Sequence, residues 1–218
     1  MAQMIRVLIV DDHALFRSGI KSLLQRHDDF EVVDVAGDGL EGVKRAKSLK
    51  PDVVLLDLNM PGVSGRDAVR LIVEDAPESR VLMLTVSEDG EDLVETLRAG
   101  ASGYLLKNIE TEALVDAIRR ANAGESVISP QMTAKLVQGV RGQTREIPAA
   151  EHDKLSPRER EILGCLSRGD SNKEIARALS LAESTVKIHI QNIFKKLGLS
   201  SRVQAALYAV EHGFSQRA

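Results

Sequence analysis

The first 124 residues alternate five times between an apolar, β-branched run and an amphipathic stretch, and this alternation constrains the fold more than any other feature. Within the amphipathic stretches Leu, Ile, Val and Ala recur at helical spacing, which predicts a helix after each strand. Five strand–helix units with short connections favour a doubly wound α/β domain on a five-stranded, mostly parallel sheet. The expected strands are 5–10, 32–36, 52–56, 81–85 and 102–106, and the expected helices are 14–26, 39–49, 65–75, 89–99 and 110–123.

Residues 155–218 follow a different pattern, in which short helices are marked by their caps. Two capping boxes, Ser156 with Glu159 and Ser171 with Glu174, open the first two helices. Four compact helices, of which the second and third are joined by a short turn, predict an all-α helix-turn-helix domain. The four helices are expected to start near residues 156, 171, 183 and 201, and the last two to span 183–197 and 201–212.

The segment 125–154 separates these two patterns. Ser129-Pro130 can open a helix, but glycines and Pro148 break the periodicity soon afterwards, so roughly 141–154 is expected to be a flexible linker. The last 64 residues, from 155 onward, carry ten Lys and Arg against six Asp and Glu, whereas the whole chain has a net charge of −3. We therefore expect a domain at 1–124, a linker at 125–154 and a basic domain at 155–218 that suits an anionic partner such as nucleic acid.

The composition predicts a cytoplasmic protein. Its single cysteine, Cys165, has no internal partner for a disulfide, which fits a reducing compartment. No apolar stretch approaches the roughly 20 residues that span a bilayer, and the chain runs from Met1 into a strand without a charged and apolar leader. We expect no contact with a membrane.

Five polar residues follow or end the predicted strands. Asp11 and Asp12 come after the first strand, Asp57 after the third, Thr85 ends the fourth, and Lys107 follows the fifth. Because open parallel sheets build their sites at the carboxyl edge, these residues are expected to converge. The set suits phosphoryl transfer to Asp57, with Mg²⁺ on Asp12 and Asp11, and with Lys107 and Thr85 on the phosphoryl oxygens. Taken singly, the acids could simply cap a helix and the lysine could be solvated; this alternative is much weaker for the whole set.

These motifs resemble the receiver domain of bacterial two-component response regulators, which has a flavodoxin-like fold. The resemblance implies that a sensor histidine kinase phosphorylates Asp57, and that Asp12 and Asp57 bind Mg²⁺ together with the backbone carbonyl of Asn59. It also implies that Thr85 and Tyr104 form a conformational switch, in which Tyr104 swings inward on activation. The matching segments are 10–13 (Val-Asp-Asp-His), 57–62 (Asp-Leu-Asn-Met-Pro-Gly), Thr85, and 104–107 (Tyr-Leu-Leu-Lys).

Two positions depart from the receiver pattern. Asn108 follows the site lysine where the family commonly has a cis proline, which leaves the geometry of the neighbouring loop open. Val86 follows Thr85 where smaller residues are common. We expect Val86 to restrict access to the phosphoryl group and to slow its loss.

The second domain resembles the LuxR-type DNA-binding domain, and the two together indicate the NarL/FixJ class. Lys187, Ile188 and Gln191 lie off the apolar stripe of the 183–197 helix and are expected to face bases in a major groove. Gln191 stands where the family often has lysine, so we expect a preference for an A·T pair there. Four further residues are expected at DNA phosphates: Thr185, His189, Lys195 and Lys196. The matching segments are 155–163 (Leu-Ser-Pro-Arg-Glu-Arg-Glu-Ile-Leu), Gly169, 172–176 (Asn-Lys-Glu-Ile-Ala), 184–190 (Ser-Thr-Val-Lys-Ile-His-Ile) and 195–197 (Lys-Lys-Leu).

The expected function is phosphorylation-dependent regulation of transcription by a protein that is not a metabolic enzyme. Two copies are expected to bind promoter DNA as a homodimer, with the 201–212 helix as a candidate contact. Two other classes remain open. A Mg²⁺-dependent phosphatase would use the same aspartyl-phosphate chemistry but needs a substrate cleft, and a ligand-sensing LuxR-type regulator needs a small-molecule pocket instead of the acidic site.

Overall fold

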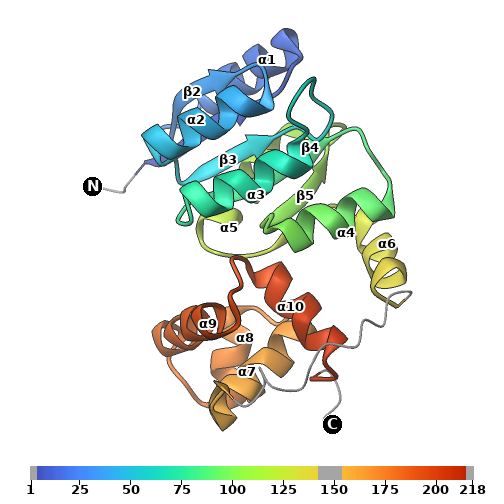
Figure 1. The fold of residues 1–218 in the computed structure, drawn as a ribbon. Coiled ribbons are helices and arrows are strands. Elements are labelled where there is room, and N and C mark those ends of the chain that lie inside the picture. Colours follow the sequence, from blue (N-terminus) through green and yellow to red (C-terminus); the bar gives the residue numbers. More distant parts are fainter. Residues whose placement is uncertain (1–3, 142–153, 215–218) are drawn as a thin grey trace. The chain divides into compact units, whose positions relative to one another are not determined.

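The computed structural model describes residues 4–141 and 154–214 (Figure 1), with the side chains of 137–141 left undescribed. The chain divides into two compact units, Met1–Leu136 and Val137–Ala218. The expected flexible linker falls almost entirely outside the described residues. Within these ranges no helix combines the length and the apolar character needed to cross a membrane.

The N-terminal unit is built on one parallel sheet in the strand order β2-β1-β3-β4-β5-β6. This confirms the doubly wound class, but the expected number of five strands is wrong. The sixth strand pairs with β5 through Gly103–Val127 and Tyr104–Ile128. A strand of two residues shows no alternation, so the sequence pattern did not reveal it. The strands are β1 Ile5–Val10, β2 Phe30–Ala36, β3 Val53–Leu56, β4 Arg80–Thr85, β5 Gly103–Leu106 and β6 Val127–Ile128.

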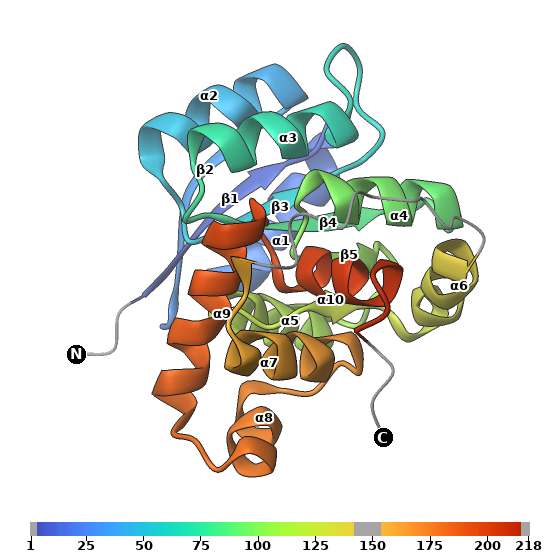
Figure 2. The ribbon, with the colours of Figure 1, turned by 60° about the horizontal axis from the view of Figure 1, so that its bottom comes forward.

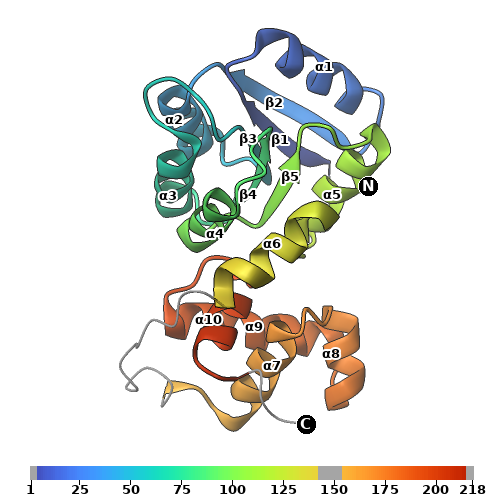
Figure 3. The ribbon, with the colours of Figure 1, turned by 90° about the vertical axis from the view of Figure 1, so that its right-hand side faces the viewer.

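Helices cover both faces of this sheet. In Figure 3, α1 and α5 lie on one side of the strands, and α2, α3 and α4 lie on the other. Strands covered on both faces are buried along their whole length, which explains why they read as continuous apolar runs. Residues of β1 such as Val7 and Ile9 join the core formed with α1 and α5. The helices are α1 Ala14–Leu24, α2 Gly39–Leu49, α3 Gly65–Asp75, α4 Gly90–Ala99 and α5 Thr111–Asn122.

The strand β6 and the helix that follows it lie within the segment expected to be a linker. Helix α6, Pro130–Arg141, begins at a proline, whose missing amide hydrogen costs nothing in a first turn. The amide of Met132 donates to the carbonyl of Ser129 at 2.8 Å, which closes the entry to the helix. Because β6 extends the sheet, residues beyond 124 take part in the N-terminal unit.

Within residues 154–214, the C-terminal unit contains the four expected helices (Figure 2). Both capping boxes form: Ser156 pairs with Glu159, and Ser171 with Glu174. A compact apolar core joins all four helices and includes Cys165, which is buried and reduced. The helices are α7 Pro157–Ser167, α8 Asn172–Leu179, α9 Glu183–Leu197 and α10 Arg202–Glu211.

Candidate functional sites

The carboxyl edge of the sheet brings Asp11, Asp57 and Lys107 into direct contact. The Lys107 Nζ lies 2.7 Å from Asp57 Oδ2 and 2.8 Å from Asp11 Oδ2. All three side chains are buried or nearly so, since Asp57 is 2% exposed, Asp11 4% and Lys107 11%. β1, β3 and β5 thus deliver the predicted residues to one point, with the lysine between two carboxylates.

The charges of this cluster depend on one another. Burial raises the pKa of Asp57 and the nearby Asp11 charge adds to this effect, while the hydrogen bond from Lys107 opposes it; the net shift is upward. Burial alone would lower the pKa of Lys107, but its hydrogen bonds to Asp11 and Asp57 outweigh burial and raise it. Both groups therefore hold their protons more strongly than they would in water, so Lys107 stays charged beside Asp57.

Four residues can offer ligand atoms to a metal ion beside this lysine. One side-chain atom from each of Asp11, Asp12, His13 and Asp57 lies within 4.8 Å of the others. Three carboxylates suit Mg²⁺, which prefers oxygen ligands and keeps several waters. His13 was not predicted to belong to the site; its Nδ1 lies 2.6 Å from Asp12 Oδ1, and its adjacency to the acid pair is the signal that could have revealed it.

Asp57 sits at a tight approach of two backbone segments. The amide of Leu58 donates to Asp57 Oδ1 at 2.8 Å and orients the carboxylate. Gly65, at the start of α3, comes so close that a Cβ there would lie 2.1 Å from the Asp57 carbonyl oxygen. Only glycine permits this approach. Asn59, whose backbone carbonyl was expected to bind the metal, is exposed two residues after the acceptor.

The predicted switch residues meet at one loop residue, Ser87. Its amide donates to Thr85 Oγ1 at 3.1 Å, and its carbonyl accepts the Tyr104 hydroxyl at 3.0 Å. Tyr104 is completely buried, and burial raises its pKa to about 12. The tyrosine therefore occupies the inward position, with Ser87 as a partner that the sequence did not indicate.

A side-chain network continues from Ser87 into two helices. Ser87 Oγ donates to Asp92 Oδ2 of α4 at 2.6 Å, and Arg66 of α3 donates to Asp92 Oδ1 at 2.7 Å. Arg66 also pairs with Glu95. The loop that carries the switch is therefore tied to α3 and α4.

The same loop is bound by α6. Lys135 Nζ lies 2.5 Å from the backbone carbonyl oxygen of Glu88 and 3.4 Å from its carboxylate. The Lys135 Cβ also lies only 3.6 Å from the position of a Cβ built on Gly90. Figures 1 and 2 both show α6 beside α4. Two successive carbonyls of the loop, Ser87 and Glu88, thus accept hydrogen bonds from Tyr104 and from α6.

An open pocket of about 640 Å³ leads to the acceptor from the side of α1. Asp57 and Lys107 lie in it, and its rim carries the exposed apolar residues Leu15, which is 89% exposed, and Val86, which is 70% exposed. Val86 therefore stands at the entrance, as its predicted role requires.

Every peptide bond among the described residues is trans, including the one before Asn108.

Helix α9 has the two faces that the sequence predicted. Val186, Ile190 and Ile193 are buried in the core of the C-terminal unit. Lys187, Ile188 and Gln191 are exposed, and Ile188 is 57% exposed despite its apolar character. An exposed Ile between polar residues suits contact with a thymine methyl. Of the residues expected at phosphates, Lys195 and Lys196 are exposed, and two are partly buried: Thr185 and His189.

Comparison with known proteins settles the family. Residues 7–119, more than half of the chain, match the family described as "Response regulator receiver domain". Residues 153–209 match "Bacterial regulatory proteins, luxR family". The chain belongs to the NarL/FixJ family of two-component response regulators. It is therefore a DNA-binding transcriptional regulator, and the family does not consist of metabolic enzymes.

Relatives of this response regulator match nearly its whole length. It is 42% identical to the nitrate/nitrite response regulator protein NarL of Escherichia coli, over 93% of both chains. It is 40% identical to the oxygen regulatory protein NreC of Staphylococcus carnosus, over 94% of this chain and 97% of the relative. The solved structure of the response regulator ChrA, from a heme-sensing two-component system, is 34% identical with a TM-score of 0.53, covering 98% of this chain and 100% of its own.

Proposed function

We propose that Asp57 of this response regulator accepts a phosphoryl group from a sensor histidine kinase, and that this modification controls binding to promoter DNA. The observation that carries the proposal is the contact of Lys107 with both Asp57, at 2.7 Å, and Asp11, at 2.8 Å. A buried nucleophile needs a cation in place before a second anion arrives, and Lys107 supplies it.

The chemistry uses the residues at the sheet edge. A carboxylate oxygen of Asp57 attacks the phosphorus, the P–N bond to the kinase histidine breaks, and an acyl phosphate forms on Asp57. Lys107 then moves its hydrogen bonds from the free carboxylates to a phosphoryl oxygen, and the Thr85 hydroxyl donates to another. Asp11, Asp12, Asp57 and the carbonyl of Asn59 would hold Mg²⁺, which would supply positive charge against the anionic transferred group.

The phosphodonor would reach Asp57 through the pocket beside α1. Leu15 and Val86 leave apolar surface at its rim. A kinase helix that carries the phosphohistidine would cover this surface and exclude water during transfer. Water reaching the acyl phosphate afterwards would return Asp57 to its free state.

DNA binding is assigned to α9. Lys187, Ile188 and Gln191 would meet base edges, and Thr185, His189 and Lys195 would meet phosphates. Two copies would bind paired half-sites as a homodimer, with α10 as the candidate contact, and the protein would act in the cytoplasm. We propose that residues 1–124 accept the phosphoryl group, that residues 155–218 bind DNA, and that residues 125–154 connect them, although β6 within this connection extends the sheet of the first unit.

The affinity of the full chain for a promoter duplex tests this function. Beryllofluoride with Mg²⁺ is expected to raise the affinity of the wild-type protein and to leave Asp57→Asn unchanged, because the mimic needs the carboxylate. Equal affinity of the wild-type protein with and without beryllofluoride would contradict the proposal.

Two measurements separate the proposal from the other two classes. A ligand-sensing regulator would keep its induced DNA binding in Asp57→Asn. A phosphatase would release phosphate continuously from a phosphomonoester, whereas we expect this protein to release none, because its proposed donor is the phosphohistidine of the kinase.

A further inference from the structure

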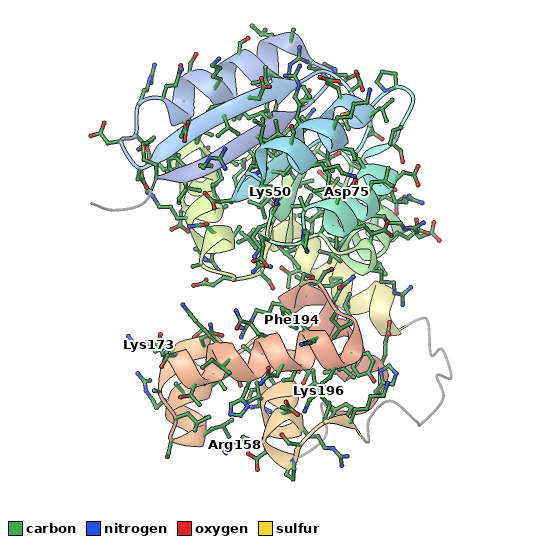
Figure 4. All side chains as sticks on the ribbon, turned by 60° about the vertical axis from the view of Figure 1, so that its left-hand side comes forward. Lys50, Asp75, Arg158, Lys173, Phe194 and Lys196 are labelled. Atoms are coloured by element: carbon green, nitrogen blue, oxygen red, sulfur yellow. The ribbon has the colours of Figure 1, made fainter. Side chains whose placement is uncertain are left out.

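Two adjacent lysines in the last turn of α9 have different surroundings. Lys196 Nζ lies 2.9 Å from Glu159 Oε1 and 2.6 Å from Glu159 Oε2. Lys195 is exposed, and within the described ranges no ion pair is recorded for it. Figure 4 labels Lys196 on α9 and Arg158 in the first turn of α7, the helix that carries Glu159. The two lysines therefore differ in what they are free to bind.

Glu159 is a buried carboxylate that is held by several hydrogen-bond donors. Its side chain is 4% exposed, and its Oε2 accepts the Ser156 amide at 2.7 Å within the capping box. Burial alone would raise the pKa of Glu159, but the hydrogen bonds from Lys196 and from Ser156 outweigh it and lower the pKa. The carboxylate is thus ionised in the interior and depends on Lys196 as its counter-charge.

This dependence limits what Lys196 can do on DNA. To bind a phosphate, the ammonium group would have to leave Glu159 and strand a buried charge, which is strongly unfavourable. While it stays, it joins the end of α9 to the first turn of α7 across 37 residues of sequence. The orientation of α9 decides which base edges Lys187 and Gln191 reach.

We propose that Lys196 is a positioning residue, which fixes α9 against α7 by binding Glu159, and that Lys195 alone of the pair takes a DNA phosphate. The inference rests on the proposed role of α9 as the DNA-reading helix. It replaces the expectation that both lysines contact phosphates.

The salt dependence of DNA binding distinguishes the two roles. Each phosphate contact releases counterions and contributes about 0.9 to the slope of log affinity against log salt. A positioning residue contributes nothing to this slope, but its loss lowers the preference for the correct sequence. Losing one base contact costs at least about fivefold in that preference.

The experiment uses the full chain with beryllofluoride and Mg²⁺. One probe is a duplex selected from a random library by the wild-type protein, and the other is a shuffled duplex of the same length. For Lys195→Gln we expect the slope to fall by about 0.9 per bound copy on both duplexes, with an unchanged ratio of the two affinities. For Lys196→Gln we expect an unchanged slope and a ratio that falls by at least about fivefold.

Two further variants test the partner and guard against misfolding. Lys196→Arg keeps the charge and is expected to restore the wild-type ratio. Glu159→Gln frees Lys196, so we expect the ratio to fall and the slope to become steeper, in the direction opposite to Lys195→Gln. All affinities are compared at a temperature at which circular dichroism shows each variant folded.

Three results would overturn the inference. A slope for Lys196→Gln reduced as in Lys195→Gln makes Lys196 a phosphate contact. If folded Lys196→Gln keeps the wild-type ratio of affinities for the selected and shuffled duplexes, the ion pair with Glu159 only stabilises the fold and does not position α9. Unchanged affinity on Lys187→Ala and Gln191→Ala removes α9 from the DNA interface, and this outcome alone also refutes the proposed role of the helix.

Discussion

The side chain of Lys135 in α6 donates a hydrogen bond to the backbone carbonyl of Glu88 at 2.5 Å. The preceding carbonyl, that of Ser87, accepts the hydroxyl of the buried Tyr104 at 3.0 Å. A movement of this loop toward a phosphoryl group on Asp57 would therefore act directly on the bond to α6. The contact gives the switch a direct physical connection to the helix that contains the boundary between the two units in the chain.

Replacing Lys135 tests this connection. We expect Lys135→Met to reduce the gain in DNA affinity that beryllofluoride produces by at least about fivefold, which corresponds to the loss of a typical coupling free energy. The rate at which Asp57 is phosphorylated should stay the same, because Lys135 is not in the acceptor site. Gln131→Met, one turn earlier on α6, is the control, and an undiminished gain in Lys135→Met would show that the contact carries no coupling.

The raised pKa of Asp57 predicts how stability depends on pH. A carboxyl whose folded pKa exceeds its unfolded value favours the protonated form, so its contribution to stability falls as the pH rises through that window. In metal-free buffer, we expect Asp57→Asn to raise the midpoint of urea unfolding at neutral pH and to change it little below pH ~4.

Mg²⁺ should reverse the order of the two proteins at neutral pH. The ion gains a carboxylate ligand in the wild-type protein that the asparagine variant lacks, so it should stabilise the wild-type protein more. An equal increase in the unfolding midpoint of both proteins would show that Asp57 does not bind the ion.

Val86 is expected to protect the acyl phosphate. It is 70% exposed at the rim of the pocket that contains Asp57, so its methyl groups stand where water and small donors approach. We expect Val86→Ala to shorten the lifetime of the phosphorylated protein, measured as loss of label from Asp57. Leu40→Ala, another exposed apolar residue outside the pocket, is the control, and an unchanged lifetime in Val86→Ala would refute the role.

Gln191 is expected to select an A·T pair. Glutamine can pair bidentately with adenine, whereas lysine donates to guanine, and each good pair contributes about 1–3 kcal/mol of discrimination. Selection from a random library with Gln191→Lys should therefore shift one position of the site from adenine toward guanine. Identical selected sites for both proteins would place Gln191 outside the base contacts.

Much of the acceptor site was predictable from the order of residues. Asp11, Asp57 and Lys107 follow parallel strands, and parallel strands end at the same edge, so their contact follows from the strand assignments alone. The apolar stripe of α9 was predictable for a similar reason, because helical periodicity assigns its faces. Both predictions use only regular local geometry.

Contacts between residues that are far apart in the sequence were not predictable. The carbonyl of Ser87 accepts the Tyr104 hydroxyl across 17 residues of sequence, and no spacing indicates this contact. The carbonyl oxygen of Val127 in β6 lies 2.3 Å from the place where a Cβ on Gly103 would be, so glycine at position 103 permits this strand to pair with β5. Only the packed sheet shows that the two backbones come this close.

The sequence by itself determined the two domains, the acceptor edge and the exposed face of α9, because periodicity and strand ends place residues without knowledge of their neighbours. Only the tertiary structure decided which of two adjacent lysines is committed to Glu159 and which loop carbonyl holds Lys135. These pairs span 37 and 47 residues of sequence. The first pair exists because packing buries the Glu159 carboxylate, and the second because packing brings the Glu88 carbonyl within reach of a long side chain. The local sequence pattern carries no information about which distant residues packing brings together.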